Sequence, residues 1–147
     1  MIYTIGYEKL TVQQLIQILK EYKVDYLFDV RSNPHSKREE FSKINLQRAI
    51  NQAEIDYHWL GATLGGRNPI NEDAIFKLHT QGRFTVICLL CLEHIPQKCH
   101  RYNEIAMRLA AAPYESQILH LVPVIDKDLP IVSKVNKVLT GNQAELF

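Results

Sequence analysis

Apolar positions along the chain alternate between short runs rich in β-branched and aromatic residues and longer stretches with helical spacing. The short runs predict strands at residues 2–6, 24–30, 55–60, 84–91 and 118–122. Thr11 with Gln14, and Asn71 ahead of two acidic residues, are typical of helix starts. These alternating elements predict an α/β fold: a single three-layer domain with a mainly parallel sheet of about five strands and helices on both faces.

The pattern changes after residue 122. Two prolines, mixed charge and one short apolar repeat follow, and the chain ends in QAELF. We therefore predict a domain over residues 1–122 and a partly docked C-terminal appendage over residues 123–147.

Composition narrows the classes of partner. The 147 residues carry a formal net charge of +1, which argues against a broad basic surface that grips duplex DNA by its phosphates. The N-terminal residues lack the pattern of a secretory signal, and the longest apolar run, Val86 to Leu92, is too short to span a membrane. Three cysteines, two of them in that run, suggest no disulfide framework, so we expect a cytoplasmic protein without a membrane partner.

Polar residues and glycines follow the ends of the predicted strands. Because the carboxyl ends of parallel strands share one edge of a sheet, these residues should form one rim, where open α/β sheets bind ligands. They are Tyr7, Asp29, Arg31, Gly65, Gly66, Arg67, Cys91 and Glu93.

Asp29 and Arg31 are two positions apart, so in an extended backbone their side chains project from the same face. The arginine can fork onto a phosphate or carboxylate while the aspartate stays ionised beside it. A structural carboxylate that ties down the next loop explains the pair equally well.

The stretch CLEHIPQKCHR, residues 91 to 101, combines a strand end with a predicted helix start at Pro96. Cys99, His100 and Arg101 would then lie in the first turns, where the positive end of the helix dipole favours an anion. In the alternative, His100 and Arg101 only hold Asp29 or Glu93 in place.

The cysteines allow metal or thiol chemistry. Cys88 and Cys91 point to opposite faces of a strand, and the spacing of Cys91, Cys99 and His100 matches no usual zinc pattern and offers no obvious fourth ligand. We therefore expect no metal and no cofactor. A nucleophilic Cys91 is the stronger rival, since DVR and the order strand, Cys, loop, helix resemble the rhodanese sulfurtransferases. However, the following LEHIPQ has neither the glycine nor the arginine of an anion-wrapping loop.

Several motifs together resemble the DUF488 family, a domain of unknown function. They are TIGY at 4–7, DVRSNPHS at 29–36, LGATLGGR at 60–67 and CLEHIPQKCHR at 91–101, and the resemblance spans roughly residues 1–122. Leu92 departs from it, since the family usually has a small residue there. The resemblance implies a small α/β domain with a polar pocket formed by Tyr7, Asp29, Arg31, Ser32, Ser36, Gly65, Gly66, Arg67, Cys91, Glu93, Cys99, His100 and Arg101.

We expect the pocket to belong to an enzyme that acts on a phosphate-containing nucleotide or nucleic acid. Arg31, Arg67 and Arg101 would grip phosphate, while Asp29, Glu93, His100 and Cys91 are the catalytic candidates. One alternative is a sulfurtransferase or redox enzyme that uses Cys91 or Cys99. Another is a non-catalytic module that binds nucleic acid or another anion.

The last five residues, QAELF, resemble the bacterial sliding-clamp-binding motif through Gln143, Leu146 and Phe147. A clamp would bring DNA close by effective concentration, which the nearly neutral surface does not. The alternative is that Leu146 and Phe147 pack on the domain itself.

Overall fold

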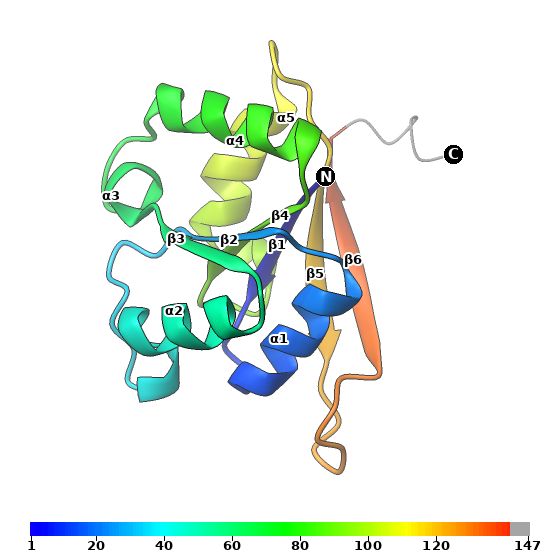
Figure 1. Cartoon of the computed structure of the whole chain (residues 1–147). Coiled ribbons are helices and arrows are strands. Elements are labelled where there is room, and N and C mark those ends of the chain that lie inside the picture. Colours follow the sequence, from blue (N-terminus) through cyan, green and yellow to red (C-terminus); the bar gives the residue numbers. More distant parts are fainter. Residues whose placement is uncertain (142–147) are drawn as a thin grey trace.

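The computed structural model describes residues 1–141, drawn in colour in Figure 1. The predicted clamp-binding residues Gln143, Leu146 and Phe147 lie outside the described residues. Among residues 1–141, no helix has the length and apolar character needed to cross a membrane.

One sheet runs through the middle of the structure, with the strand order β3-β2-β4-β1-β5-β6. The first five strands in chain order pair in parallel, and β6 pairs antiparallel with β5. The predicted α/β fold with a mainly parallel sheet is therefore confirmed. The strands are β1 (Ile2–Gly6), β2 (Tyr26–Asp29), β3 (Asp56–Trp59), β4 (Ile87–Cys91), β5 (Ile118–Val124) and β6 (Lys134–Thr140).

The sheet has one strand more than the five predicted. β6 pairs with β5 over its whole length, from Thr140 opposite Ile118 to Lys134 opposite Val124. The predicted division at residue 122 thus falls inside β5. The signal for β6 was weak because the strand lies at an edge of the sheet, where charged side chains such as Lys134 and Lys137 are common.

Helices cover both faces of the sheet, as Figure 1 shows. Each face has its own core cluster of buried side chains, and β4 contributes to both. One face carries α1 (Val12–Glu21) and α2 (Lys43–Gln52). The other carries α3 (Gly61–Leu64), α4 (Glu72–Phe84), the π-helical segment η3 (Arg101–Ala106) and α5 (Met107–Ala110).

The predicted helix caps are present. The Thr11 hydroxyl accepts from the Gln14 backbone N–H at 3.1 Å, while the Gln14 side chain accepts from the Thr11 N–H at 2.9 Å. The Asn71 side chain accepts from the Ala74 N–H at 3.0 Å and starts α4. Each cap satisfies backbone donors that the first helical turn leaves without a partner.

A buried polar chain joins three neighbouring strands. The His120 ring on β5 lies 2.6 Å from the Thr4 hydroxyl on β1 and 2.9 Å from the Thr140 hydroxyl on β6. All three side chains are buried. Burial, followed by the positive charge of Arg101, lowers the pKa of His120 to about 4.

We predict that this histidine makes the fold sensitive to acid. The unfolded chain takes up the His120 proton near pH 6.5 and the folded chain only near pH 4, so the unfolded state binds more protons in this window. The free energy of unfolding should therefore fall by up to about 3 kcal/mol from this group as the pH drops from 6.5 to 4. Urea titrations at several pH values measure the loss.

The variant His120→Gln should lose clearly less stability over the same pH range, because it has no imidazole to protonate. His35→Gln, at an exposed position, is the matched control and should behave like the wild type. Equal acid sensitivity in His120→Gln and wild type would contradict the prediction.

Candidate functional site

The loops at the carboxyl end of the sheet diverge around β4. The connections that follow β1 and β2 carry α1 and α2 over one face, whereas the connection after β4 carries η3 and α5 over the other. In open α/β sheets such a divergence leaves a crevice where ligands bind. The end of β4 and the loop that follows it lie at this divergence and therefore form the candidate site.

The loop after β4 crosses closely over the end of β1. The backbone N–H groups of Tyr7 and Glu8 donate to the carbonyls of Cys91 at 3.1 Å and of Leu92 at 2.9 Å. A Cβ atom on Gly6 would overlap the carbonyl of Glu93, so only glycine allows this approach. Gly6 therefore positions Glu93, a role that the sequence analysis did not assign to it.

Three of the predicted site residues, Tyr7, Asp29 and Arg31, form an acid–arginine cluster together with Tyr57, which was not among the predicted residues. The Asp29 carboxylate accepts from Arg31 Nε at 2.8 Å, from Arg31 Nη2 at 2.7 Å, from the Arg31 backbone N–H and from the Tyr57 hydroxyl. Arg31 Nη1 donates to the Phe41 carbonyl at 2.8 Å and to the Tyr7 hydroxyl at 3.3 Å. Asp29 is fully buried and Arg31 nearly so.

The carboxylate of Asp29 and the guanidinium of Arg31 thus make their hydrogen bonds to each other and to other groups of the protein. Burial lowers the pKa of Arg31, but the hydrogen bonds to Asp29 and its negative charge outweigh it and raise the pKa overall. Burial and the charge of Asp29 also raise the pKa of Tyr57, so its hydroxyl keeps its proton and donates. The cluster thus ties the loop that ends at Phe41 to β2, as expected of a structural carboxylate.

The second group forms a thiol–imidazole cluster: Cys91, Glu93, Cys99 and His100. Nδ1 of His100 lies 3.8 Å from the sulfur of Cys91 and 3.7 Å from the sulfur of Cys99. Nε2 of His100 lies 2.9 Å from the Val30 carbonyl. A carbonyl only accepts, so Nε2 carries a proton and, in the neutral ring, the Nδ1 lone pair faces both sulfurs.

The two thiols differ in acidity because of their surroundings. A hydrogen bond from Cys91, together with His100 and the positive Arg101, lowers the pKa of Cys99 despite its burial. The hydrogen bond to Cys99, followed by burial, raises the pKa of Cys91. Cys99 is therefore the thiol that ionises first.

Cys99 also affects the pKa values of the other two residues of the cluster, Glu93 and His100. Burial, then the hydrogen bond with Cys99, raises the pKa of Glu93. Burial lowers the pKa of His100, but the hydrogen bond and charge of Cys99 outweigh it and raise the pKa overall. The cluster thus holds two groups that can carry a proton near a thiolate.

Arg101 is a buried residue that contacts the backbone of this cluster. It is fully buried, and it donates through Nε to the Thr4 hydroxyl at 3.1 Å and through Nη1 to the Glu93 carbonyl at 2.8 Å. Thr4 was not among the predicted site residues, since nothing in its sequence context marks the contact. Arg101 therefore acts on the loop that carries Glu93, and its charge lies near Cys99.

The helix predicted from Pro96 is interrupted. Residues Pro96–Lys98 form a single 3-10 turn (η2), Cys99 is extended with φ −127° and ψ 147°, and the helical segment that follows has His100 as its N-cap. Cys99 and Arg101 are thus not in one continuous first turn. The sequence has no glycine or proline between Lys98 and Arg101 to signal the break.

The remaining predicted residues lie in two loops beside these clusters. The Ser32 hydroxyl accepts from the Arg67 N–H at 3.2 Å, and the Ser36 hydroxyl accepts from the Arg38 N–H at 3.1 Å. A Cβ on Gly66 would lie only 3.2 Å from Cγ of His100, so this loop packs on the imidazole. A Cβ on Gly65 would overlap the carbonyl of Gly61.

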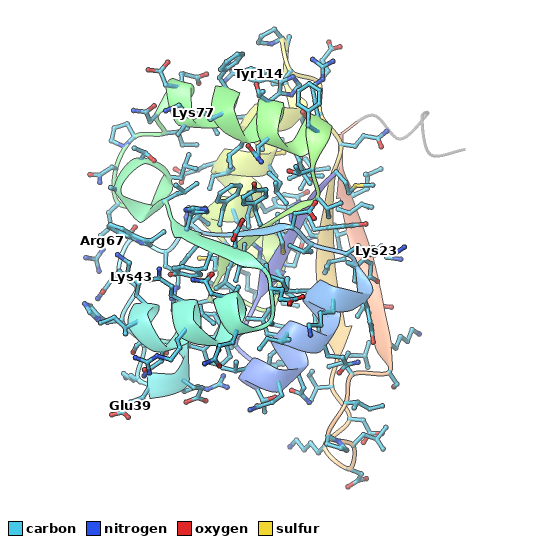
Figure 2. The ribbon with its side chains drawn as sticks, in the orientation of Figure 1. Lys23, Glu39, Lys43, Arg67, Lys77 and Tyr114 are labelled. Atoms are coloured by element: carbon cyan, nitrogen blue, oxygen red, sulfur yellow. The ribbon has the colours of Figure 1, made fainter. Side chains whose placement is uncertain are left out.

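Of the three arginines predicted to grip phosphate, Arg67 is exposed, whereas Arg31 and Arg101 are buried and hydrogen-bonded within the protein. Figure 2 shows Arg67 and Lys43 projecting from the same side of the molecule. The acid–arginine cluster lies on the α1–α2 side of the sheet, and Cys91 and Cys99 lie on the α4–α5 side. That all these residues line one pocket stays a prediction. The groove of about 830 Å³ lined by β2, β3 and α4 contains neither cluster.

Comparison with known proteins finds one family model that matches part of the chain. The model for "Domain of unknown function DUF488" matches residues 11–74, which confirms the resemblance inferred from the sequence motifs. The match includes the acid–arginine pair and the loop at Gly65 and Gly66, and it ends before the stretch that carries Cys91 and Cys99. No curated protein and no solved structure matches the chain.

The structure predicts that Arg31→Ala severely destabilises the fold. Removing the guanidinium leaves the Asp29 carboxylate buried without its charge partner, which typically costs about 3–5 kcal/mol. Arg67→Ala, at an exposed position, is the matched control and should change the free energy of unfolding by no more than about 0.5 kcal/mol. Urea denaturation of both variants tests the difference, and a small effect of Arg31→Ala would contradict the structural role.

Proposed function

We propose that this chain, whose residues 11–74 match the model of the DUF488 family, is an enzyme that acts on a phosphate-containing nucleotide or nucleic-acid substrate. Its reacting groups are those of the thiol–imidazole cluster, at the end of β4. The acid–arginine cluster positions the neighbouring loop, and Arg67 is the contact for a substrate anion.

One observation carries the enzymatic part of the proposal. Two thiols converge on the imidazole of His100, whose ring is fixed by the Val30 carbonyl at 2.9 Å, and the carboxyl group of Glu93 contacts Cys99. Titratable groups whose pKa values are displaced by one another, held at the carboxyl end of a parallel sheet, are typical of catalytic sites. Cys91 and Cys99 are mostly buried, yet His100 is only partly so, which leaves an approach from solvent.

The substrate class rests on the exposed side chain of Arg67, whose loop lies beside this cluster. The Arg67 backbone is held by Ser32, and its loop packs on His100, so its guanidinium extends from residues in contact with the reacting groups. Lys43, on the same side of the molecule, lies 5.0 Å from the Trp59 ring centroid. A guanidinium forks onto phosphate oxygens, so Arg67 can bind an anion locally although the chain is nearly neutral.

Thiol chemistry is a second candidate function. It is favoured by the contact of Cys99 with both Cys91 and His100, because a thiolate beside an imidazole is a nucleophile and a nearby second thiol can resolve the product. A sulfurtransferase or redox enzyme of this kind needs Cys99. It does not need the carboxylate of Glu93.

The test is to incubate the full chain with pools of nucleotides and short oligonucleotides and to analyse the pools by mass spectrometry. We expect a product that the wild type forms and that Cys99→Ala, His100→Ala and Glu93→Gln each reduce by about 10²–10⁴-fold. Cys88→Ala is the matched control, since Cys88 lies on β4 outside the cluster and should leave product formation unchanged.

Each outcome separates the two functions. Activity lost in Cys99→Ala but kept in Glu93→Gln would favour thiol chemistry. Pools left unchanged by the wild type would contradict an enzyme that acts on nucleotides or nucleic acids.

We also propose that the peptide QAELF recruits the enzyme to a bacterial sliding clamp. A synthetic peptide that covers residues 137–147 should bind purified clamp in a fluorescence-polarisation titration, because burying the Leu and Phe side chains in a pocket of the partner is favourable. Replacing Leu146 and Phe147 with alanine should abolish binding, while a variant with Asn142→Ala should keep it. A wild-type peptide with a Kd weaker than about 1 mM would rule out this recruitment.

A further inference from the structure

We propose that Cys91, Cys99 and His100 bind one thiophilic divalent metal ion of the zinc class, with Glu93 beside its open coordination position. The proposal rests on the proposed function, because it assigns the water that would hydrolyse the substrate to a metal ion in the same cluster. It also revises the expectation, based on sequence spacing, that the chain holds no metal.

The distances within the cluster match those between ligands of a tetrahedral ion. Zinc binds thiolate at about 2.3 Å and imidazole at about 2.0–2.1 Å, so sulfur and nitrogen atoms around one tetrahedral ion lie about 3.6 Å apart. Here Nδ1 of His100 lies 3.8 Å from one sulfur and 3.7 Å from the other, and the three atoms all lie within 4.8 Å of one another. A metal ion fits between them after small side-chain adjustments.

The orientation of the imidazole is that of a metal ligand. Metal-bound histidines nearly always donate their second ring N–H to a carbonyl or carboxylate, which fixes the ring and its tautomer. The Val30 carbonyl accepts from Nε2 in this way, and the loop at Gly66 packs against the ring. A single Nδ1 lone pair then faces two sulfurs, although as a hydrogen-bond acceptor it would serve only one of them well.

The donor set selects the class of metal. Two thiolates and an imidazole suit zinc or a similar transition metal, whereas magnesium and calcium require oxygen ligands. The two thiolate charges also offset the charge of a divalent ion, which matters because Cys91 and Cys99 are buried. Sequence spacing did not reveal the set because the extended backbone of Cys99, between η2 and His100, makes an irregular ligand pattern.

The carboxylate of Glu93 is the group that would accept a proton from a metal-bound water. Three protein ligands leave one position for water, as in catalytic zinc sites. Oε2 of Glu93 is buried and has no hydrogen-bond partner within residues 1–141, while the carboxyl group contacts Cys99. We therefore assign Glu93 as the acceptor of a proton from the water rather than as a fourth ligand.

This arrangement supports hydrolysis. The bound water transfers one proton to Glu93, and the resulting hydroxide adds to the electrophilic atom of the substrate. The bond to the leaving group X then breaks, and Glu93 returns the proton to X. The balance is substrate–X + H₂O → substrate–OH + HX, without an oxidant or reductant.

The experiment uses the full chain, purified with a reductant and stripped with a chelator, and titrated with Zn²⁺ or Co²⁺ alone. We expect about one ion per chain, with thiolate-to-cobalt charge-transfer absorption in the near ultraviolet for Co²⁺. Cys91→Ala, Cys99→Ala and His100→Ala should each weaken Zn²⁺ binding by more than about tenfold. Cys88→Ala and Glu93→Gln should keep the stoichiometry, and circular dichroism checks that each variant is folded.

The results distinguish the metal from the enzyme. Absence of stoichiometric Zn²⁺ and Co²⁺ binding by the wild type, or equal binding by folded Cys99→Ala, would overturn the metal site. If product formation then still required Cys99 and His100, the proposed function would stand. Metal binding without any product from the nucleotide pools would instead support the site and contradict the proposed function.

Discussion

The alternation of side chains along β4 determines on which face of the sheet each candidate side chain lies. All five residues of this central strand are buried, and they alternate between the two cores, with Leu90 on the α1–α2 side and Cys91 on the α4–α5 side. Asp29 pairs in register with Leu90 and follows it to the first side. Because neighbouring strands in register share their faces, the acid–arginine cluster lies on one face of the sheet and the thiols lie on the other.

The loop after β4 depends on close backbone packing and on one buried guanidinium. Gly6 allows the carbonyl of Glu93 to pass over the end of β1, and Arg101 holds that carbonyl from the other side at 2.8 Å. A fully buried arginine is costly unless its hydrogen bonds and a negative charge compensate for the lost hydration. Arg101 is one of the groups that lower the pKa of Cys99, so the same residue that stabilises the loop also favours ionisation of this thiol.

Much of the fold could be predicted from the sequence because its signals are local. Thr11 with Gln14 and Asn71 mark helix starts by their own side-chain chemistry, and the apolar run at 84–91 marks a buried central strand. The edge strand β6 could not be predicted in this way, since its pattern depends on pairing with β5. The candidate residues at the strand ends were likewise found from position, but their division between two faces depends on register.

The partners of the arginines depend on tertiary contacts that no local pattern encodes. A motif such as DVR predicts an anion near Arg31, and the structure supplies one inside the protein, the carboxylate of Asp29 at 2.7 Å. Arg101 similarly has its negative partner near by in Cys99, whose pKa it helps to lower. Two of the three basic side chains therefore interact with groups that belong to the protein itself. Only Arg67 among the three is exposed, on the loop that packs on His100, so it alone of the three is available to the external anion of the proposed function.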